Sequence, residues 1–321
     1  MPNQIITKRE LSFRVRRIGR GICFFFFLCA LAGLVAESEP KRPAILGIAF
    51  VQISSSDPAA AKGFYEEVGA LRSNYSALES PDYGVCPSCN MVEHFRRRQE
   101  QVILVKYPDS APSSHIDRIV FRVSDAEKLR HYLSAEGVQI RSTASALGYF
   151  EIVDPEGQRI GFLQKSRSDG WNNDMTPVPP RMIHAGFIVR DREKMEHFYK
   201  DILGFRPYWH GGMKDDETSW VSLQVPNGTD WLEFMLYDPT GKDKHFLGVM
   251  NHIALGVTDI QATKAQLIKN GVKLTEEPKL GRDGKWQLNV YDPDETRVEF
   301  MEFTPKEKPC CSEFTAPHPQ P

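Results

Sequence analysis

Residues 288–303 read LNVYDPDETRVEFMEF, a run that predicts a strand, a tight Asp-Pro turn and a second strand. In the second strand Arg297, Glu299, Met301 and Phe303 share one face, because strand side chains alternate. Glu299 is therefore expected to point into an apolar interior. An unpaired carboxylate there is costly, so it must be protonated, paired with a cation or bound to a metal ion.

This run closes the last unit of a fourfold internal repeat, in which each unit reads as a strand, a helix and three strands. Residues 154–162 (DPEGQRIGF) match residues 292–300 (DPDETRVEF), and residues 63–69 (GFYEEVG) match residues 197–204 (HFYKDILG). The four units cover residues 45–107, 116–164, 182–237 and 251–303.

The helix of the third unit carries the clearest helical pattern. Apolar residues at positions 195, 198, 199, 202 and 203 form one face, with Asp191 as the N-cap and Gly204 at the end. Asp259 and Gly271 bracket the helix of the fourth unit in the same way. The Pro-rich residues 171–180 separate the two pairs of units and predict a linker.

Composition narrows the classes of function. The chain has 321 residues, of which 41% are hydrophobic, and this length predicts two domains. With 40 Lys and Arg against 42 Asp and Glu, and no long run of either sign, it lacks the basic footprint of a nucleic-acid-binding protein. We therefore expect no nucleic-acid partner.

The N-terminus has the layout of a secretory signal peptide over residues 1–36. Six Lys and Arg residues precede the apolar residues 22–36, which end in small side chains and are shorter than a membrane span. We expect an exported protein, periplasmic or secreted, without stable membrane association after cleavage; an uncleaved membrane anchor is the alternative. Export permits disulfides among Cys86, Cys89, Cys310 and Cys311, whose pairing the sequence leaves open.

Repeated βαβββ units, with Phe-Tyr near the helix end and an Asp-Pro hairpin before the last strand, resemble the vicinal oxygen chelate superfamily. This family includes glyoxalase I, extradiol dioxygenases, methylmalonyl-CoA epimerase and bleomycin-resistance proteins. The resemblance covers residues 45–303 and implies an α+β fold, in which four βαβββ units pair into two glyoxalase-like domains. It also implies a divalent metal ion in a cavity, held by the first and last strands of each unit.

The matching positions in the third and fourth units are His184, Glu233, His252 and Glu299, at spacings of 49, 19 and 47 residues. Imidazole nitrogens with carboxylate oxygens suit Zn, Ni, Co, Mn or Fe(II). A lone strand His or Glu is usually a packing or surface residue. Four such residues at all four expected positions favour a metal site.

The first two units provide an internal comparison. Gly47 or Phe50, Ile103, Arg118 and Gly161 stand opposite the four ligands, and they do not form a metal-binding set. We therefore predict an N-terminal domain without metal ligands (residues 41–166), a C-terminal metal-binding domain (181–304) and a disordered tail (305–321). The remaining histidines of the N-terminal domain are interpreted as surface or packing residues: His94, His115 and His131.

The resemblance implies an enzyme, with two competing activities. The first is a divalent-metal-dependent isomerase, epimerase or lyase that removes a proton and stabilises an enediolate, with Glu299 as base and Glu233 as ligand or second base. The alternative is an extradiol-type ring-cleaving dioxygenase with His184, His252 and Glu299 as a facial triad, against which Glu233 counts. A non-catalytic, ligand-sequestering protein is the third option.

The expected partner is a small vicinal-dioxygen compound, either a hydroxy-ketone or a sugar-like molecule. An exported enzyme would meet little glutathione, which counts against strict glyoxalase I activity. Five side chains on strands or strand ends could contact the substrate: Trp209, His210, Trp220, Lys285 and Gln287. The protein is expected to be a monomer or a homodimer.

Overall fold

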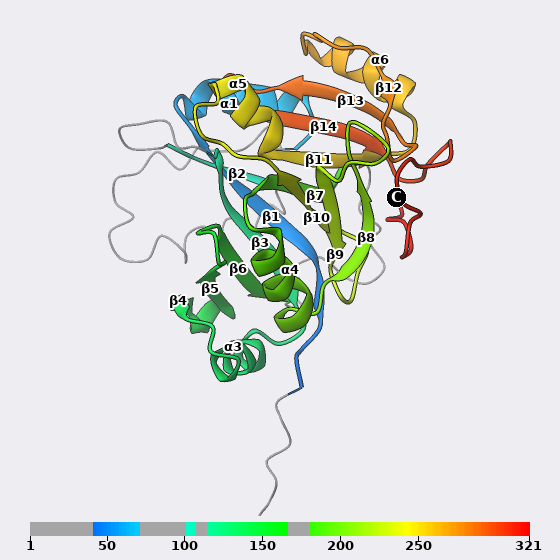
Figure 1. Cartoon of the computed structure of the whole chain (residues 1–321). Helices are drawn as coiled ribbons and strands as arrows, with labels where there is room; N and C mark the ends of the chain where they lie inside the picture. Colours follow the sequence, from blue (N-terminus) through cyan, green and yellow to red (C-terminus); the bar gives the residue numbers. More distant parts are fainter. Residues whose placement is uncertain (1–40, 71–100, 107–113, 166–179) are drawn as a thin grey trace, which may run out of the picture. The chain divides into compact units, whose positions relative to one another are not determined.

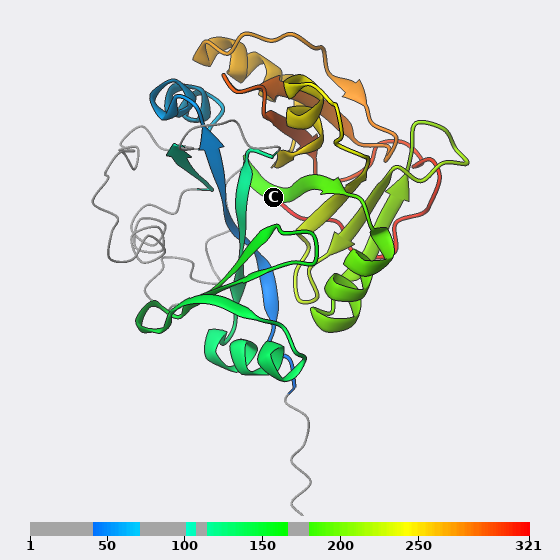
Figure 2. The ribbon, with the colours of Figure 1, turned by 60° about the vertical axis from the view of Figure 1, so that its left-hand side comes forward.

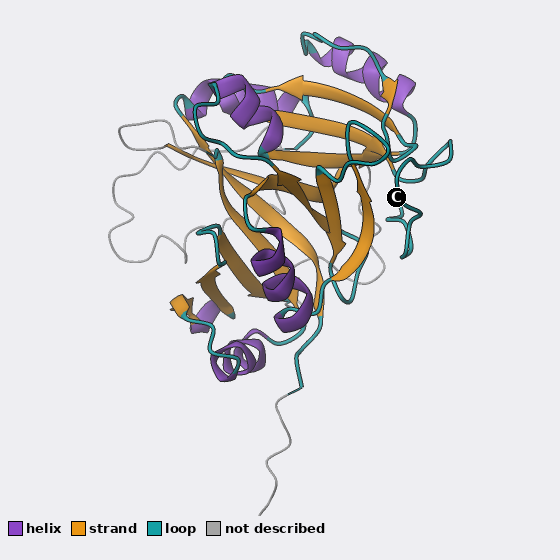
Figure 3. Ribbon diagram, viewed as in Figure 1, coloured by secondary structure: helices purple, strands orange, loops and turns teal. Residues whose placement is uncertain are grey.

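The computed structural model describes residues 41–70, 101–106, 114–165 and 180–321. The predicted signal peptide, Cys86, Cys89, His94 and nearly all of the predicted linker lie outside the described residues. Residues Pro40–Pro321 form one compact unit. Within it, the described strands form two curled sheets with helices against them, so the fold is α+β as predicted (Figure 1; Figure 3).

The first sheet has six strands in the described part of the chain, in the order β2-β1-β3-β6-β5-β4. The long strand β1 (blue in Figures 1 and 2) runs antiparallel to β3, and each pairs in parallel with the last strand of its own unit, β2 or β6. The elements are β1 (Ile45–Ser55), α1 (Pro58–Glu67), β2 (Val102–Lys106), β3 (Ile116–Val123), α3 (Ala126–Ala135), β4 (Ile140–Ala144), η1 (Ser145–Leu147), β5 (Tyr149–Val153) and β6 (Arg159–Gln164).

The second sheet repeats this plan with eight described strands, in the order β12-β13-β14-β11-β7-β10-β9-β8. Its central strands β7 and β11 are antiparallel, and they pair in parallel with β10 and β14. The elements are β7 (Arg181–Val189), α4 (Arg192–Glu196), the π-helical turn η2 (His197–Ile202), β8 (Arg206–Gly211), β9 (Trp220–Gln224), β10 (Trp231–Leu236), α5 (Lys244–Met250), β11 (His252–Val257), α6 (Ile260–Asn270), β12 (Lys279–Leu280), β13 (Trp286–Tyr291) and β14 (Arg297–Glu302).

The helix ends follow the sequence. The Asp191 carboxylate accepts from the Lys194 amide at the start of α4, and Asp259 caps α6 through two backbone amides. Gly271 ends α6 with a φ of 97°, in the left-handed region that favours glycine. The predicted caps are therefore confirmed, and the predicted apolar face of the third unit's helix packs into the core.

Two motifs of the internal repeat meet in space. The hydroxyl of Tyr65, at the end of α1, donates to Asp292 at 3.0 Å, and the equivalent Tyr199 donates to Asp154 at 3.1 Å. Each tyrosine thus binds the Asp-Pro turn of a unit in the other sheet. Burial raises the pKa of Asp154 and of Asp292 to about 6. These two reciprocal hydrogen bonds tie the two sheets together.

A continuous apolar core supports both sheets and their helices. It includes Phe121 of β3 and Phe205, whose rings meet edge to face at 5.5 Å. Val298 and Phe300 of β14 face this core, whereas Met301 and Phe303 belong to a second cluster on the opposite face. The predicted alternation of the final strand is confirmed, with Glu299 on the face of the second cluster and 3% exposed.

The C-terminal tail contradicts its prediction as disordered. Residues 305–321 lie against the edge strand β8, where the red chain end is labelled in Figure 1. The Thr315 amide donates to the Tyr208 carbonyl at 3.0 Å, and the Tyr208 hydroxyl lies 2.7 Å from Nδ1 of His318. Phe314 packs on the Tyr208 ring, and Cys310 is bonded to Cys311. These tertiary contacts hold a segment whose composition alone indicates disorder.

Helices that are long and apolar enough to cross a membrane are absent from the described residues.

Candidate metal centre

A cavity of about 340 Å³ opens on the face of the eight-stranded sheet that carries Glu299. Glu233 and Glu299 belong to its lining, and the fully buried His184 and His252 lie beside these carboxylates. Other lining side chains are Tyr208, Trp209, Met213, Trp220, Trp231, Lys279, Arg282, Gln287, Asn289, Arg297 and Phe314.

Strand register explains why the four predicted ligands come together. His184 of β7 and Glu299 of β14 flank Ala254 of β11 in one row across the sheet. Two residues along, Glu233 of β10 and His252 of β11 flank Gly186 of β7 in a second row. Side chains two residues apart share a face, so all four donors point to the same side. The small residue between each pair leaves room for them to converge.

Each carboxylate has an oxygen close to both histidine nitrogens. The Nε2 atoms of His184 and His252 are 3.0 Å apart, and Oε2 of Glu299 is 3.7 Å from each. Oε2 of Glu233 is 3.3 Å from Nε2 of His252 and 3.9 Å from that of His184. Metal–ligand bonds of about 2.1 Å place ligand atoms about 3 to 4.2 Å apart in an octahedral site. His184, His252 and Glu299 therefore form a group that could share one divalent ion, with Glu233 beside the two histidines.

The histidines are prepared for this role by their surroundings. The Met250 carbonyl lies 3.3 Å from Nδ1 of His252 and can only accept, so Nδ1 carries the proton and Nε2 has a free lone pair. The His184 ring packs on Trp231, with centroids 4.7 Å apart. A Cβ at Gly186 would overlap the His252 ring, so glycine is needed at this position.

Burial controls the charge of the donors. It lowers the pKa of His184 and of His252 well below their usual value, which favours the neutral imidazoles that bind metals. Burial also raises the pKa of Glu233, and it raises that of Glu299 to about 7. Two carboxylates and two imidazoles thus converge in a buried place where a divalent cation would compensate their charge.

Three of the five predicted substrate contacts line the cavity: Trp209, Trp220 and Gln287. The other two do not. His210 is exposed on β8, where its amide and carbonyl bind Ser312 of the tail. Lys285 is fully buried behind the wall, with its Nζ 3.2 Å from the Tyr208 hydroxyl and 4.6 Å from the centre of the Trp231 ring.

Sequence reasoning missed the polar residues that give the cavity its charge. Arg297 stands two residues before Glu299 on the same face of β14, and Asn289 pairs with Glu299 on the neighbouring strand. Strand alternation places Arg297 on the face of Glu299, but the sequence did not assign this side chain to the site. Lys279 belongs to the two-residue strand β12 and Arg282 to the loop before β13, and neither segment is long enough to show a periodicity that gives orientation.

The six-stranded sheet has other residues at the equivalent positions. Phe50, Val120 and Gly161 form the row that corresponds to the row of His184, Ala254 and Glu299, so Phe50 rather than Gly47 is the counterpart of His184. Arg118 replaces His252, and its guanidinium binds Glu151 at 2.6 Å. The described part of this sheet thus has a buried ion pair in place of the four donors.

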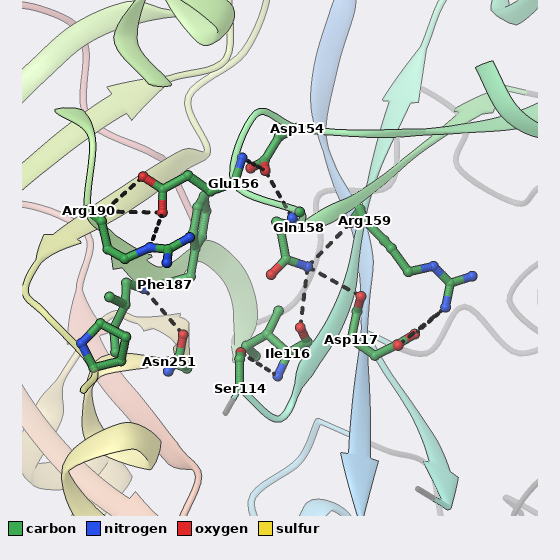
Figure 4. Close-up of a pocket in the computed structure, with 13 residues that line it drawn as sticks. Ser114, Ile116, Asp117, Asp154, Glu156, Gln158, Arg159, Phe187, Arg190 and Asn251 are labelled. Atoms are coloured by element: carbon green, nitrogen blue, oxygen red, sulfur yellow. Dashed lines mark hydrogen bonds and ion pairs between the residues drawn. The ribbon is translucent and has the colours of Figure 1, made fainter. Parts of the chain in front are cut away.

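A second cavity, of about 360 Å³, lies where β3 and the β5–β6 turn approach β7 (Figure 4). Its charged side chains pair with one another or with backbone groups. Glu156 accepts from the amide and the guanidinium of Arg190, and Arg159 binds Asp117 at 3.1 Å. His184, His252 and Glu299, whose donor atoms could share one ion, lie at the first cavity, which is therefore the stronger candidate for a functional site. The other such group within the described residues contains Cys310 and Cys311, which are bonded to each other.

Comparison with known proteins agrees with this geometry. The family model described as Glyoxalase/Bleomycin resistance protein/Dioxygenase superfamily matches residues 181–300. The lactoylglutathione lyase of Haemophilus influenzae is 30% identical over 124 residues, which cover 38% of this chain and 92% of the relative. The mitochondrial methylmalonyl-CoA epimerase of Homo sapiens is 32% identical over 123 residues, covering 36% of this chain and 68% of the relative.

Solved structures match over both sheets. The anaerobic substrate complex of homoprotocatechuate 2,3-dioxygenase from Brevibacterium fuscum has a TM-score of 0.55 at 16% identity, covering 85% of this chain and 86% of that one. An extradiol ring-cleaving dioxygenase from B. fuscum has a TM-score of 0.56 at 17% identity, covering 85% of this chain and 75% of that one. At this identity, the likeness shows the shared fold.

Proposed function

We propose that this chain, which belongs to the Glyoxalase/Bleomycin resistance protein/Dioxygenase superfamily, is a divalent-metal-dependent isomerase, epimerase or lyase. Its substrate would be a small vicinal-dioxygen compound. The observation that carries the proposal is a pair of histidine nitrogens 3.0 Å apart beside a cavity, with an oxygen of each glutamate 3.3–3.9 Å from both nitrogens.

His184, His252, Glu233 and Glu299 would hold the ion. When bound, the divalent ion supplies Lewis-acid polarisation of two neighbouring substrate oxygens, which acidifies a carbon-bound proton. Glu299 is assigned as the base: its carboxylate would leave the ion, take the proton from carbon and return it to the product. Its side chain is 4% exposed, against 14% for Glu233, so water competes less at Glu299.

The second carboxylate separates this chemistry from oxygen activation. A 2-His-1-carboxylate triad leaves three positions of an octahedral ion open, enough for a bidentate substrate and dioxygen. Glu233 lies 3.3 Å from His252 Nε2, close enough to take one of those positions. A bidentate substrate would then fill the remaining two.

The cavity also limits the size of the substrate. A volume of about 340 Å³ is at the small end of the range of roughly 300–1,000 Å³ for ligand pockets. This supports a compact hydroxy-ketone or hydroxy-acid as the ligand, rather than a conjugate with a large carrier.

Two measurements test the proposal. Elemental analysis should find one divalent ion per chain, lost in His184→Ala and His252→Ala but kept in His245→Ala, whose imidazole is exposed outside the cavity. Solvent deuterium should enter hydroxy-ketones anaerobically, and Glu299→Gln should slow this exchange about 10²- to 10⁴-fold. Metal retention in both ligand variants contradicts the site.

A ring-cleaving dioxygenase is the second candidate, because the donor atoms of His184, His252 and Glu299 all lie within 4.8 Å of one another without Glu233. In that case Glu233 would turn away from the ion and leave a position for dioxygen. Oxygen consumption with a ring-opened catechol product would establish this reading. A rise of that activity in Glu233→Gln would remove the four-ligand argument.

A further inference from the structure

The candidate centre has an approximate two-fold arrangement that is broken at one pair of positions. Trp231 precedes Glu233 by two residues on β10, and Arg297 precedes Glu299 by two residues on β14. Both side chains line the cavity beside a ligand row. An indole on one side and a guanidinium on the other give the two ends of the cavity different chemistry.

The guanidinium of Arg297 is poorly satisfied by the protein. Its Nε is buried and has no hydrogen-bond partner among the described residues, and its side chain is 14% exposed. Its carboxylate neighbour among the described residues, Oε2 of Glu299, is 3.8 Å from Nη2, beyond hydrogen-bond distance. Glu299 is also one of the four converging donors, so its charge is shared with the ion.

The other two cations of the cavity have partners of their own. Lys279 binds Glu276 at 2.8 Å, and Arg282 pairs with Asp215. A divalent ion with Glu233 and Glu299 has no net charge. Asp283, which also lines the cavity, is offset by the buried ammonium of Lys285 beside it. Arg297 therefore leaves one positive charge at this end of the cavity, which an anionic ligand group would compensate.

The opposite wall is aromatic. Trp209 and Trp220 lie nearly parallel, with ring centroids 6.4 Å apart and planes 21° apart, and Trp231 completes the surface. Nε1 of Trp220 is buried and also has no partner within the described chain. This wall suits a flat or apolar group with one hydrogen-bond acceptor.

From this asymmetry, and resting on the proposed function, we infer that the substrate is a carboxylic acid. It would chelate the ion through its vicinal oxygens, place its carboxylate on Arg297 and turn its apolar part to Trp209 and Trp220. Nη2 of Arg297 would lie within about 6 Å of an ion bound by Glu299. A substrate carboxylate oxygen that accepts a hydrogen bond from Nη2 would then lie within about 9 Å of that ion. Arg297 is thus a specificity-determining residue.

The test compares two chelators of the same shape and different charge. Zn²⁺-loaded protein is titrated calorimetrically, without oxygen, with 3,4-dihydroxybenzoate and with its neutral analogue 3,4-dihydroxybenzamide. The wild type should bind the acid at least about tenfold more tightly than the amide, as expected for a charge-assisted hydrogen bond. Arg297→Gln should bring the two affinities within about twofold and leave amide binding nearly unchanged.

Matched variants keep the outcome interpretable. Arg282→Gln removes a paired cation of the same cavity and should retain the preference for the acid. Arg297→Lys keeps the positive charge and should retain part of the preference for the acid. Both Arg297 variants should bind Zn²⁺ as the wild type does. Equal affinity for acid and amide in the wild type, or an unchanged preference in Arg297→Gln, overturns the inference alone. Zn²⁺-loaded wild type that binds neither compound refutes the chelating site itself, and the inference with it.

Discussion

Gly186→Ala should disable the metal centre without removing any ligand. A Cβ built at this position lies 2.5 Å from Nδ1 and 2.7 Å from Nε2 of His252, and closer still to Cε1. To reach an ordinary contact, Nε2 must move by at least about 0.7 Å. Metal–ligand distances tolerate only about 0.2 Å, so His252 can no longer complete the site.

The expected loss of metal affinity is at least about 100-fold, the upper end of the effect of second-shell changes. At a fixed excess of Zn²⁺ this lowers the metal-dependent part of the free energy of unfolding by about 2.7 kcal/mol. Competition with a chelating dye gives the affinity. Urea unfolding with and without EDTA gives the metal-dependent stability.

Gly256→Ala is the matched control. The added Cβ at position 256 would overlap the Phe303 ring and lie 2.8 Å from Cγ2 of Ile183. It would therefore strain the apolar cluster that contains Ile183 and Phe303, but it would touch no metal ligand. Both variants should lose about 1–3 kcal/mol of metal-free stability from overpacking. Only Gly186→Ala should lose metal affinity. A folded Gly186→Ala protein that binds Zn²⁺ as tightly as the wild type would refute the reasoning.

Further predictions concern the support of the site. Tyr65→Phe and Tyr199→Phe should each lower the free energy of unfolding by about 1–3 kcal/mol in urea titrations, because each removes the hydroxyl donor from Oδ2 of a buried carboxylate, whereas Tyr237→Phe should change it little. From about pH 4 through 6, metal-free wild type should lose stability relative to an Asp154→Asn, Asp292→Asn variant, because the raised pKa values of these two carboxyls make them bind more protons in the folded state than in the unfolded state. A wild-type stability that rises relative to the variant over this range would contradict them. Deleting residues 309–321 should expose Lys285 to acylating reagents at neutral pH, because burial lowers the pKa of this amine to about 8. Mass spectrometry of labelled peptides would show the acylation of Lys285. Equal labelling of Lys285 in the intact chain would count against its buried position.

Strand alternation and the family resemblance together predict much of the site. Alternation places Glu299 on the inner face, and the resemblance implies His184, Glu233 and His252 as its partners, which the strand register brings to the same side of the sheet. The caps Asp191 and Asp259 follow equally well, since a side chain that binds amides two or three residues away needs no tertiary information.

Features that depend on contacts distant in sequence could not be predicted. Lys285 alternates correctly with Gln287, but the tail residue Phe314 and the β8 residue Tyr208 close over it, so it is removed from the cavity. The composition of the tail is typical of a disordered segment, because its single Phe and its polar residues acquire partners only on elements distant in sequence, such as β8, β9 and the loop before β13. The need for glycine at position 186 likewise appears only when the His252 ring is placed.

The N-terminal half acts on the site through the turn that starts the ligand strand. Asp294 accepts from the Ser55 hydroxyl at 2.6 Å and from the Ser56 amide at 2.8 Å, while Tyr65 holds Asp292 of the same turn. This turn leads directly into β14, which carries Arg297 and Glu299. The turn that begins β14 is thus anchored by β1 and α1. The N-terminal half of the chain, which lacks the four donors, therefore still helps to determine where Glu299 and Arg297 lie. This gives the repeat a physical role beyond duplication of a fold.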